Sequence, residues 1–417
     1  MAALEVAEAV ARIMRDVAPL GMEHVALDAS WNRVLAEPLR APLTLPQWTN
    51  SAMDGYAVCA ADLRGASEAA PVRLRVLETV MAGGFPTRSL GAGEAIRIMT
   101  GAPVPEGADS VVRVEDTDDG RATVEIRDDR DAGKNLRPAG EDMRAGDIVL
   151  PAGMPIGAPQ IGVLAACGAA RVPVWRRPRV AIVGSGDELV PLDRYDEVLA
   201  GRKIASSNNH AIAAAVRAAG GEPVDLGVTA DDLDALRDRI ALARGCDVVV
   251  TTAGASVGES DFTRAAIAAL GGETLFWRVR MRPGAPVGFG AVLGVPWIGL
   301  PGNPVSALVT FELFVRPMLR RMGGHDRPYR RAVQATLAER VQTGPRLTHF
   351  LRARLTYTAG GPVAHLTGPQ GSGILTSMAT ADALIVVPHD VETYAAGDAV
   401  TVLPLADAGA HVAELAL

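Results

Sequence analysis

Two periodicities of hydrophobic and polar residues alternate along the chain. Residues 1–17 carry apolar side chains at helical spacing, which predicts an amphipathic helix. From about residue 27 to residue 174, short β-branched runs are separated by Gly and Pro, as is typical of strands joined by turns. Between residues 179 and 322, apolar strands alternate with helical segments, and this order predicts a parallel sheet with helices on both faces. Short strands return after about residue 330.

These changes of pattern predict an α/β protein of several domains, whose central part is a doubly wound, mostly parallel sheet. A length of 417 residues corresponds to roughly three domains at about 150 residues each. The expected segments are an N-terminal helix over 1–26 that packs on the central domain, a β-rich domain over 27–46 and 145–175, a second β-rich domain over 47–144, a central α/β domain over 176–325, and a C-terminal β domain over 326–417.

Composition and charge exclude several classes of protein. Hydrophobic residues make up 48% of the sequence, enough for sizeable cores, and the formal net charge of −7 opposes non-specific attraction to nucleic acid. The three cysteines form no CxxC pair, so neither a disulfide framework nor a zinc cluster is indicated, and the cytoplasm fits best. An uncharged stretch over 151–170 is broken by Pro and Gly, so we expect no membrane span.

Candidate chemistry is expected in the loops that follow the central strands, because ligands of such sheets bind outside the carboxyl ends of the strands. The first loop, GSGDE at 184–188, places Asp187 and Glu188 side by side. Adjacent carboxylates suggest Mg²⁺, which usually binds one or two carboxylates together with substrate phosphate. The alternative is that Asp187 caps the next segment and Glu188 is solvated, and spacing alone leaves both open.

Two further loops combine glycines or proline with a helix start. In the loop at 251–261, glycines would let backbone N–H groups approach an anion, whereas Asp261 could simply cap the following helix. In the loop at 300–306, Asn303 and Pro304 predict the N-cap and the first position of a long helix. Two interpretations of that loop remain open. Its rigid backbone lines a pocket for an anion or a ring, or the loop is a plain tight turn.

Three arginines, Arg278, Arg280 and Arg282, follow one another at two-residue spacing, which places them on one face of an extended segment. Three cations on one face repel one another unless an anion lies opposite, and guanidinium groups suit phosphate or another tetrahedral oxyanion. The alternative is a solvated strand face with carboxylates nearby.

Several motifs in the N-terminal half indicate only turns when their spacing is considered alone. Together with the central loops, however, they resemble the molybdopterin molybdenumtransferase family, the molybdenum insertases that complete molybdenum cofactor synthesis. The resemblance covers essentially the whole chain. It depends, in order, on NSAMDGYAV, RIMTGAPVPEGADSVV, the GED around Asp142, VGSGDEL, SVGESDFT and GLPGNPVSA.

The resemblance implies an elongated homodimer whose central domain is similar to molybdopterin adenylyltransferases. Its active site would be a cleft completed by the N-terminal β domains of the partner chain. The implied reaction transfers molybdenum from molybdate to the dithiolene of adenylylated molybdopterin and releases AMP, assisted by Mg²⁺ or a similar divalent ion. Contacts with the molybdopterin adenylyltransferase and with apo-molybdoenzymes are implied as well. Because the substrate supplies the dithiolene sulfurs, no cysteine cluster is needed.

The resemblance also implies functional candidates motif by motif. The implied catalytic residues are Asp54, Thr100, Asp142, Glu188, Asp231 and Asp261, and the implied metal ligands are Asp187, Glu188 and Asp261. The implied substrate-binding residues are Gly184, Ser185, Gly186, Gly254, Ser256, Gly258, Arg278, Arg282, Pro301, Gly302, Asn303, Pro304, Ser306, Arg352 and Ser372.

The chain departs from the family pattern at a few positions. Arg278 and Arg282 stand where lysines are common, and Ala285 lacks a positive charge that is often present. Ser206 stands where an aspartate is common, and Ala253 where a glycine is usual. Two alternative functions remain open. One is an adenylyltransferase acting on molybdopterin, which the extra β domains disfavour. The other is a non-catalytic molybdopterin-binding scaffold whose altered arginine loop no longer supports insertion.

Overall fold

The computed structural model describes residues 3–253 and 259–405, and the side chains of residues 253 and 259–261 lie outside this description. The chain forms two compact units. The first unit consists of Met1–Ala36, Gly153–Gly157 and Arg171–Leu417, and the second consists of Glu37–Ala152 and Ala158–Ala170. Both units are therefore built from segments that are discontinuous in sequence.

A six-stranded sheet forms the centre of the first unit. Its order is β15 (Glu222–Thr229), β12 (Arg179–Ser185), β16 (Val248–Ala253), β20 (Val295–Pro301), β19 (Gly288–Val292) and β17 (Glu273–Phe276). The first four strands are parallel, whereas β19 and β17 run antiparallel to their neighbours. The mostly parallel α/β sheet expected from the sequence is confirmed.

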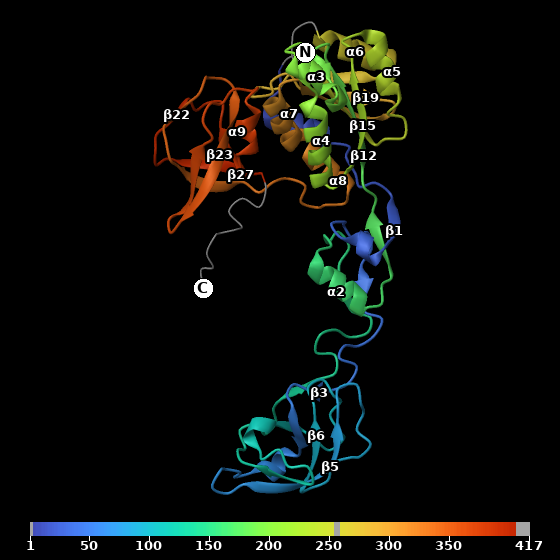
Figure 1. Ribbon diagram of the computed structural model, residues 1–417, viewed down its shortest axis with the longest axis vertical. Helices are drawn as coiled ribbons and strands as arrows, with labels where there is room; N and C mark the ends of the chain where they lie inside the picture. The colour runs from blue at the N-terminus through green and yellow to red at the C-terminus, as the bar shows by residue number, and fades with distance from the viewer. Residues whose placement is uncertain (1–2, 254–258, 406–417) are drawn as a thin grey trace. The chain divides into compact units, whose positions relative to one another are not determined.

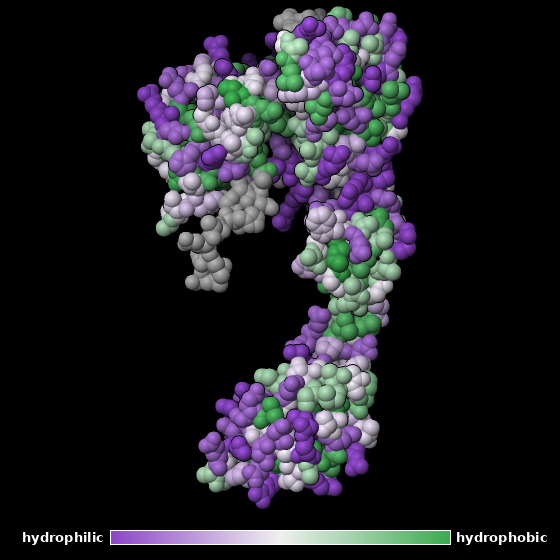
Figure 2. All heavy atoms as spheres, viewed as in Figure 1, coloured by the Kyte–Doolittle hydropathy of each residue, from purple (hydrophilic) through white to green (hydrophobic). Residues whose placement is uncertain are grey.

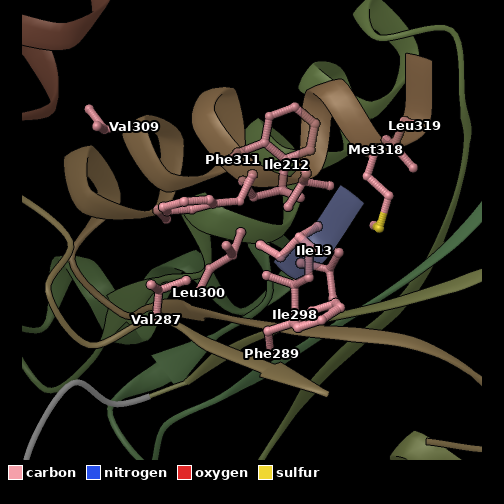
Figure 3. Close-up of a cluster of buried hydrophobic side chains, with 14 of the residues drawn as sticks. Ile13, Ile212, Val287, Phe289, Ile298, Leu300, Val309, Phe311, Met318 and Leu319 are labelled. Atoms are coloured by element: carbon pink, nitrogen blue, oxygen red, sulfur yellow. The ribbon is translucent and has the colours of Figure 1, made fainter. Parts of the chain in front are cut away.

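Helices cover both faces of this sheet (Figure 1). They are α1 (Val6–Met14), α4 (Ser207–Ala218), α5 (Leu233–Ala241), α6 (Glu259–Ala269), α7 (Pro304–Thr310) and α8 (Arg316–Met322), with a π-helical turn over Phe311–Val315 between the last two. The short helix α3 (Tyr195–Leu199) lies beside the β13–β14 pair instead. Ile182 and Ile298 point into a core shared with α1, α4, α7 and α8, and Ile13 of α1 lies among these side chains (Figure 3). Val183 and Val249 belong to a second core with α5 and α6. Because successive strand residues point to opposite faces, the two cores hold the sheet from both sides.

Short strands flank the main sheet of the first unit. β1 (Met22–Ala26) pairs antiparallel with β11 (Arg171–Trp175), and β13 (Leu189–Val190) pairs parallel with β14 (Ile204–Ala205). The second pair matters for the site, because it brings the segment before α4 beside the loop that follows β12. Ile204 N donates to Glu188 O at 2.9 Å, and Ser206 N donates to Val190 O at 2.9 Å.

The C-terminal part of the first unit is a small barrel. Its elements are β21 (Val333–Leu337), β22 (Val341–Gln342), β23 (Thr348–Thr358), β24 (Gly361–Leu366), α9 (Leu375–Ala379), β25 (Ala383–Val387), β26 (Thr393–Tyr394) and β27 (Ala399–Pro404). The order β23-β24-β21-β27-β25 closes, since β25 also pairs with β23. β18 (Met281–Arg282), which comes from the central part of the chain, adds beside β23. The expected C-terminal β domain is confirmed.

The second unit is rich in β structure. Its five-stranded sheet has the order β7 (Ser110–Arg113), β4 (Gly55–Val58), β6 (Glu94–Ile98), β5 (Val72–Val80) and β8 (Thr123–Ile126). The remaining elements are the pairs β2 (Leu39–Arg40) with β10 (Ile148–Leu150) and β3 (Asn50–Ser51) with β9 (Leu136–Arg137), and the helix α2 (Ala158–Ala166). Fully buried Tyr56 and Ile96 each lie in an apolar core of this unit.

No helix in the described ranges is both long and apolar enough to cross a membrane. On the face drawn in Figure 2, hydrophilic residues cover much of the central α/β part. Large exposed hydrophobic side chains such as Leu199 and Leu242 are present on this unit as well.

Candidate active site

A pocket of about 590 Å³ lies at the carboxyl ends of β12, β16 and β20, and we call it the strand-end pocket. Its volume lies in the range of small-molecule sites. Five of the residues predicted from the sequence line it, namely Ser185, Glu188, Gly302, Asn303 and Pro304. The loops after β12 and β20 therefore share one cavity, as expected for ligand binding at the carboxyl ends of parallel strands.

Glycine is required where the first loop leaves β12. A Cβ atom on Gly184 would lie 2.6 Å from Asn209 Oδ1, and one on Gly186 would lie 2.8 Å from both carboxylate oxygens of Glu188. The Glu188 carboxylate therefore lies directly against the backbone of Gly186, in a place that a larger residue would occupy.

The start of α7 forms the opposite wall. Asn303 is the N-cap and Pro304 the first helical residue, although the Asn303 side chain makes no capping hydrogen bond. Asn208 Nδ2 donates to Gly302 O at 2.6 Å, and Val305 N donates to Ser372 O at 3.1 Å. The second bond ties the C-terminal barrel to this wall, where Gly373 also lines the pocket. Pro301 ends β20, and Ser306 is buried inside α7.

Four polar lining residues were missed as site residues by the sequence analysis, namely Ser206, Ser207, Asn208 and Thr252. The first three form the start of α4, which the β13–β14 pairing carries to the pocket. The signal in the sequence was the run SSNN before a helical pattern, a typical helix start that by itself names no ligand.

Asp187 faces a different hollow from its neighbour Glu188. It lines a cavity of about 540 Å³ together with Gly186, Arg194 and Lys203. Its carboxylate Oδ1 accepts from the backbone N of Asp231 at 3.2 Å, and its carbonyl oxygen accepts from Lys203 Nζ. The structure therefore brings Asp187 and Asp231 together but separates Asp187 from Glu188.

The described residues contain no group of three His, Cys, Asp or Glu side chains placed to hold a metal ion. Asp261 is the third predicted ligand, and its side chain lies outside the described residues, although α6 begins at Glu259. The predicted positions Gly254, Ser256 and Gly258 lie outside them as well.

The three spaced arginines alternate with buried residues, Val279 and Met281, so all three guanidinium groups are on the exposed side. Arg280 Nη1 lies 3.1 Å from Glu5 Oε1, which supplies a carboxylate to the middle arginine. Arg282 lies apart from the strand-end pocket.

Arg282 instead lines a second pocket of about 520 Å³, which we call the arginine pocket. Arg340, His349 and Arg352 line it too. His349 is buried, and burial, with the nearby charge of Arg282, lowers its pKa, so the ring stays neutral near pH 7. The pocket offers two exposed guanidinium groups, Arg282 and Arg340, to an oxyanion.

Arg352 is fully buried and holds the loop at 369–371 in place. Its guanidinium donates to the carbonyl oxygens of Pro369, Gln370 and Gly371 at 3.0–3.2 Å and to Ser377 Oγ at 3.1 Å. Most of its donors are therefore used inside the protein. The bonded loop leads directly into Ser372, so Arg352 supports the barrel side of the strand-end pocket.

The remaining predicted residues belong to the second unit. Asp54 accepts two hydrogen bonds from Thr100, which come from its backbone N and from its hydroxyl. Asp142 lies on a separate turn after β9, where its backbone N donates to Leu45 O at 3.1 Å. Gly55 follows Asp54 in β4 and has no room for a side chain, since a Cβ there would lie 1.9 Å from Val112 O.

The fold and the strand-end pocket define an α/β protein with a cavity where parallel strands end and helices begin. Three family models match the chain in sequence order: the MoeA N-terminal region (domain I and II) over residues 4–168, a probable molybdopterin binding domain over 181–321, and the MoeA C-terminal region (domain IV) over 334–405. The chain belongs to the molybdopterin molybdenumtransferase family, and the family resemblance seen in its motifs is confirmed.

Relatives match over nearly the full chain. Molybdopterin molybdenumtransferase 2 of Mycobacterium tuberculosis is 40% identical over 396 residues, covering 93% of this chain and 95% of the relative. The molybdopterin molybdenumtransferase of Staphylococcus aureus is 34% identical over 418 residues, covering 99% and 98%. Among solved structures, the molybdopterin biosynthesis moeA protein from Pyrococcus horikoshii OT3 superimposes with a TM-score of 0.82 at 28% identity, covering 97% of this chain and 100% of that chain.

Proposed function

We propose that the protein is a molybdenum insertase, which transfers molybdenum from molybdate to the dithiolene of adenylylated molybdopterin and releases AMP. One observation carries the proposal: a polar strand-end pocket, lined by predicted site residues, lies in a chain whose relatives are named molybdopterin molybdenumtransferases over 93% or more of its length. The extra β structure of the second unit and of the barrel argues against an adenylyltransferase.

Both reactants are anions, so two binding places are needed. The strand-end pocket offers neutral hydroxyl and amide donors from Ser185, Ser207 and Asn303, and we assign adenylylated molybdopterin to it. The arginine pocket offers Arg282 and Arg340, and we assign molybdate to it, because guanidinium groups bind tetrahedral oxyanions through paired N–H donors.

Glu188 is the acidic side chain that lines the strand-end pocket among the described residues. A single carboxylate beside hydroxyl groups fits Mg²⁺, which often binds through one carboxylate and the phosphate oxygens of its substrate. When bound, Mg²⁺ would neutralise negative charge that develops as AMP leaves. Glu188 would orient the phosphate side of the substrate, and Asp261 remains a proposed second ligand.

Asp54, Thr100 and Asp142 are proposed catalytic residues on the second unit. The hydrogen bonds from Thr100 keep the Asp54 carboxylate ionised and fixed in direction, which suits a group that positions a substrate. We further propose that the protein acts as a cytoplasmic homodimer, which receives its substrate from a molybdopterin adenylyltransferase and passes its product to apo-molybdoenzymes.

The proposal is tested by incubating the purified protein with adenylylated molybdopterin and Mg²⁺, with and without molybdate, and measuring AMP. We expect AMP release that depends on molybdate. No release at any molybdate concentration would reject insertion and favour a non-catalytic scaffold. Consumption of ATP with free molybdopterin would favour an adenylyltransferase. Sedimentation velocity of the same sample measures the oligomeric state.

A further inference from the structure

The N-terminus of α4 opens into the strand-end pocket. The helix has 12 residues, and Ser206 at its N-cap lines the pocket together with Ser207 and Asn208. The first backbone N–H groups of an α-helix have no partner inside the helix, and they give this end a partial positive charge. Such an end attracts anions, but a helix start alone does not identify a ligand site.

Ser206 supplies an independent observation. The residue is only 5% exposed, and its hydroxyl oxygen has no hydrogen-bond partner among the described residues. An N-cap serine normally accepts a hydrogen bond from the backbone near the helix start, yet Ser206 makes no such bond. Buried hydroxyl groups are nearly always paired, because leaving one unpaired is costly. Among the described residues, the hydroxyl therefore has an unused donor in a residue that lines the pocket.

The surroundings of Ser206 consist mainly of neutral groups. The described wall contains the carboxylate of Glu188, whereas Ser185, Thr252 and Asn303 contribute neutral hydroxyl and amide groups. Asn208 is held by its bond to Gly302 O, so the start of α4 is fixed against the turn that precedes α7. The donors at this helix start are thus arranged before any ligand arrives.

We propose that the Ser206 hydroxyl and the first backbone N–H groups of α4 bind the oxygen atoms of a phosphate group. If the proposed function is right, this phosphate belongs to adenylylated molybdopterin, and the inference rests on that function for the identity of the ligand. The phosphate site itself rests only on the geometry of Ser206 and α4.

The test is isothermal titration calorimetry of the full chain with AMP, with inorganic phosphate and with adenosine, in EDTA. We expect Ser206→Ala to bind AMP and phosphate about tenfold or more weakly, because a hydrogen bond to a charged oxygen is lost. Ser206→Asp should bind them more weakly still, since it adds a second carboxylate beside Glu188. Binding of adenosine, which lacks the phosphate, should stay unchanged in both variants.

Thr263→Val is the matched control. The Thr263 hydroxyl is also buried and without a partner among the described residues, but it does not line the pocket. This variant should bind AMP like the wild type. Thermal unfolding without ligand separates binding from structure: Ser206→Ala should not lower the Tm, because it breaks no hydrogen bond, whereas the AMP-induced rise in Tm should shrink.

Wild-type affinity for AMP and phosphate in Ser206→Ala would overturn the site, as would a wild-type protein that binds neither ligand. A protein that binds phosphate through Ser206 but releases no AMP with molybdate would retain the site and reject the proposed function. A protein that turns over normally with unchanged AMP binding in Ser206→Ala would retain the function and reject the site.

Discussion

The carboxylate oxygen Oδ1 of Asp54 lies 2.7 Å from both the backbone N and the hydroxyl oxygen of Thr100. The two residues come from different motifs, after β3 and after β6, and the sheet of the second unit brings them together. These bonds, the backbone one most of all, lower the pKa of Asp54.

Thr100→Val should raise the pKa of Asp54 part of the way back, because the hydroxyl donor is lost while the backbone donor remains. NMR titration of the carboxyl carbon measures this change. Since the folded-state pKa is lowered, the bonds stabilise the fold above the unfolded pKa of about 3.9, and this contribution is lost as the pH falls through the folded pKa. Thr123→Val, on an exposed position of β8, is the control; an identical titration in both variants would contradict the prediction.

Arg282→Ala should raise the molybdate concentration needed for half-maximal AMP release. A charge-assisted contact contributes about 1.5–3 kcal/mol, which corresponds to roughly ten- to a hundredfold. The control is Arg280→Ala, because the Arg280 guanidinium is paired with Glu5. If the molybdate dependence of Arg282→Ala matches that of the control, Arg282 does not bind molybdate.

Glu188→Gln should lower AMP release by about a hundredfold or more and raise the Mg²⁺ concentration required, since the pocket loses the carboxylate proposed to hold the ion. The amide is nearly isosteric, so the fold should be retained, as circular dichroism can check. Glu197→Gln, at an exposed ion pair with Arg194, is the control. Unchanged Mg²⁺ dependence in Glu188→Gln would remove Glu188 from the metal site.

Arg352→Ala should destabilise the protein by about 3 kcal/mol, because it leaves buried carbonyl groups at 369–371 unpaired and opens a cavity. Urea unfolding measures the loss. Arg354→Ala lies on the same strand with an exposed side chain, whose Nε donates to Thr380 O, and it should cost under about 1 kcal/mol. Equal losses of unfolding free energy in the two variants would show that the buried hydrogen bonds of Arg352 stabilise the protein no more than the exposed bond of Arg354 does.

His325 makes the fold sensitive to acid. Burial first, and then the charges of Arg320 and Arg316, lower its pKa from 6.5 to about 4. In the unfolded chain the His325 ring therefore takes up a proton near pH 6.5, whereas in the folded protein it stays neutral down to about pH 4. The contribution of His325 to the free energy of unfolding is fully present above pH 6.5 and is lost as the pH falls toward 4.

His325→Gln should accordingly lose less stability than the wild type between pH 7 and pH 5. Urea midpoints at the two pH values measure the difference. His24→Gln, at an exposed position of β1, should behave like the wild type. A His325→Gln protein with the full wild-type pH dependence would assign the effect to other groups.

The sequence predicted the central sheet because short, continuously apolar runs alternate with segments whose apolar residues follow helical spacing. The position of each strand also located the loop that follows it. It could not predict which loop residues share a cavity. Asp187 and Glu188 are adjacent in sequence but face different hollows, since the backbone turns between them. Ser206 reaches the pocket through the pairing of β13 with β14, and Arg280 meets Glu5 from the N-terminal segment. Both contacts are long-range, and no local pattern encodes them.

β18 is a two-residue strand of the central part that pairs with the start of β23 in the C-terminal barrel, with Arg282 opposite His349. On the other side of the same segment, Leu4 N donates to Arg278 O and Arg280 N donates to Leu4 O. A chain that ends before the barrel would lack β23, the strand with which β18 pairs. Arg282 would also lose the barrel residues that line its pocket. Shortened versions made for crystallography should therefore keep residues 326–405.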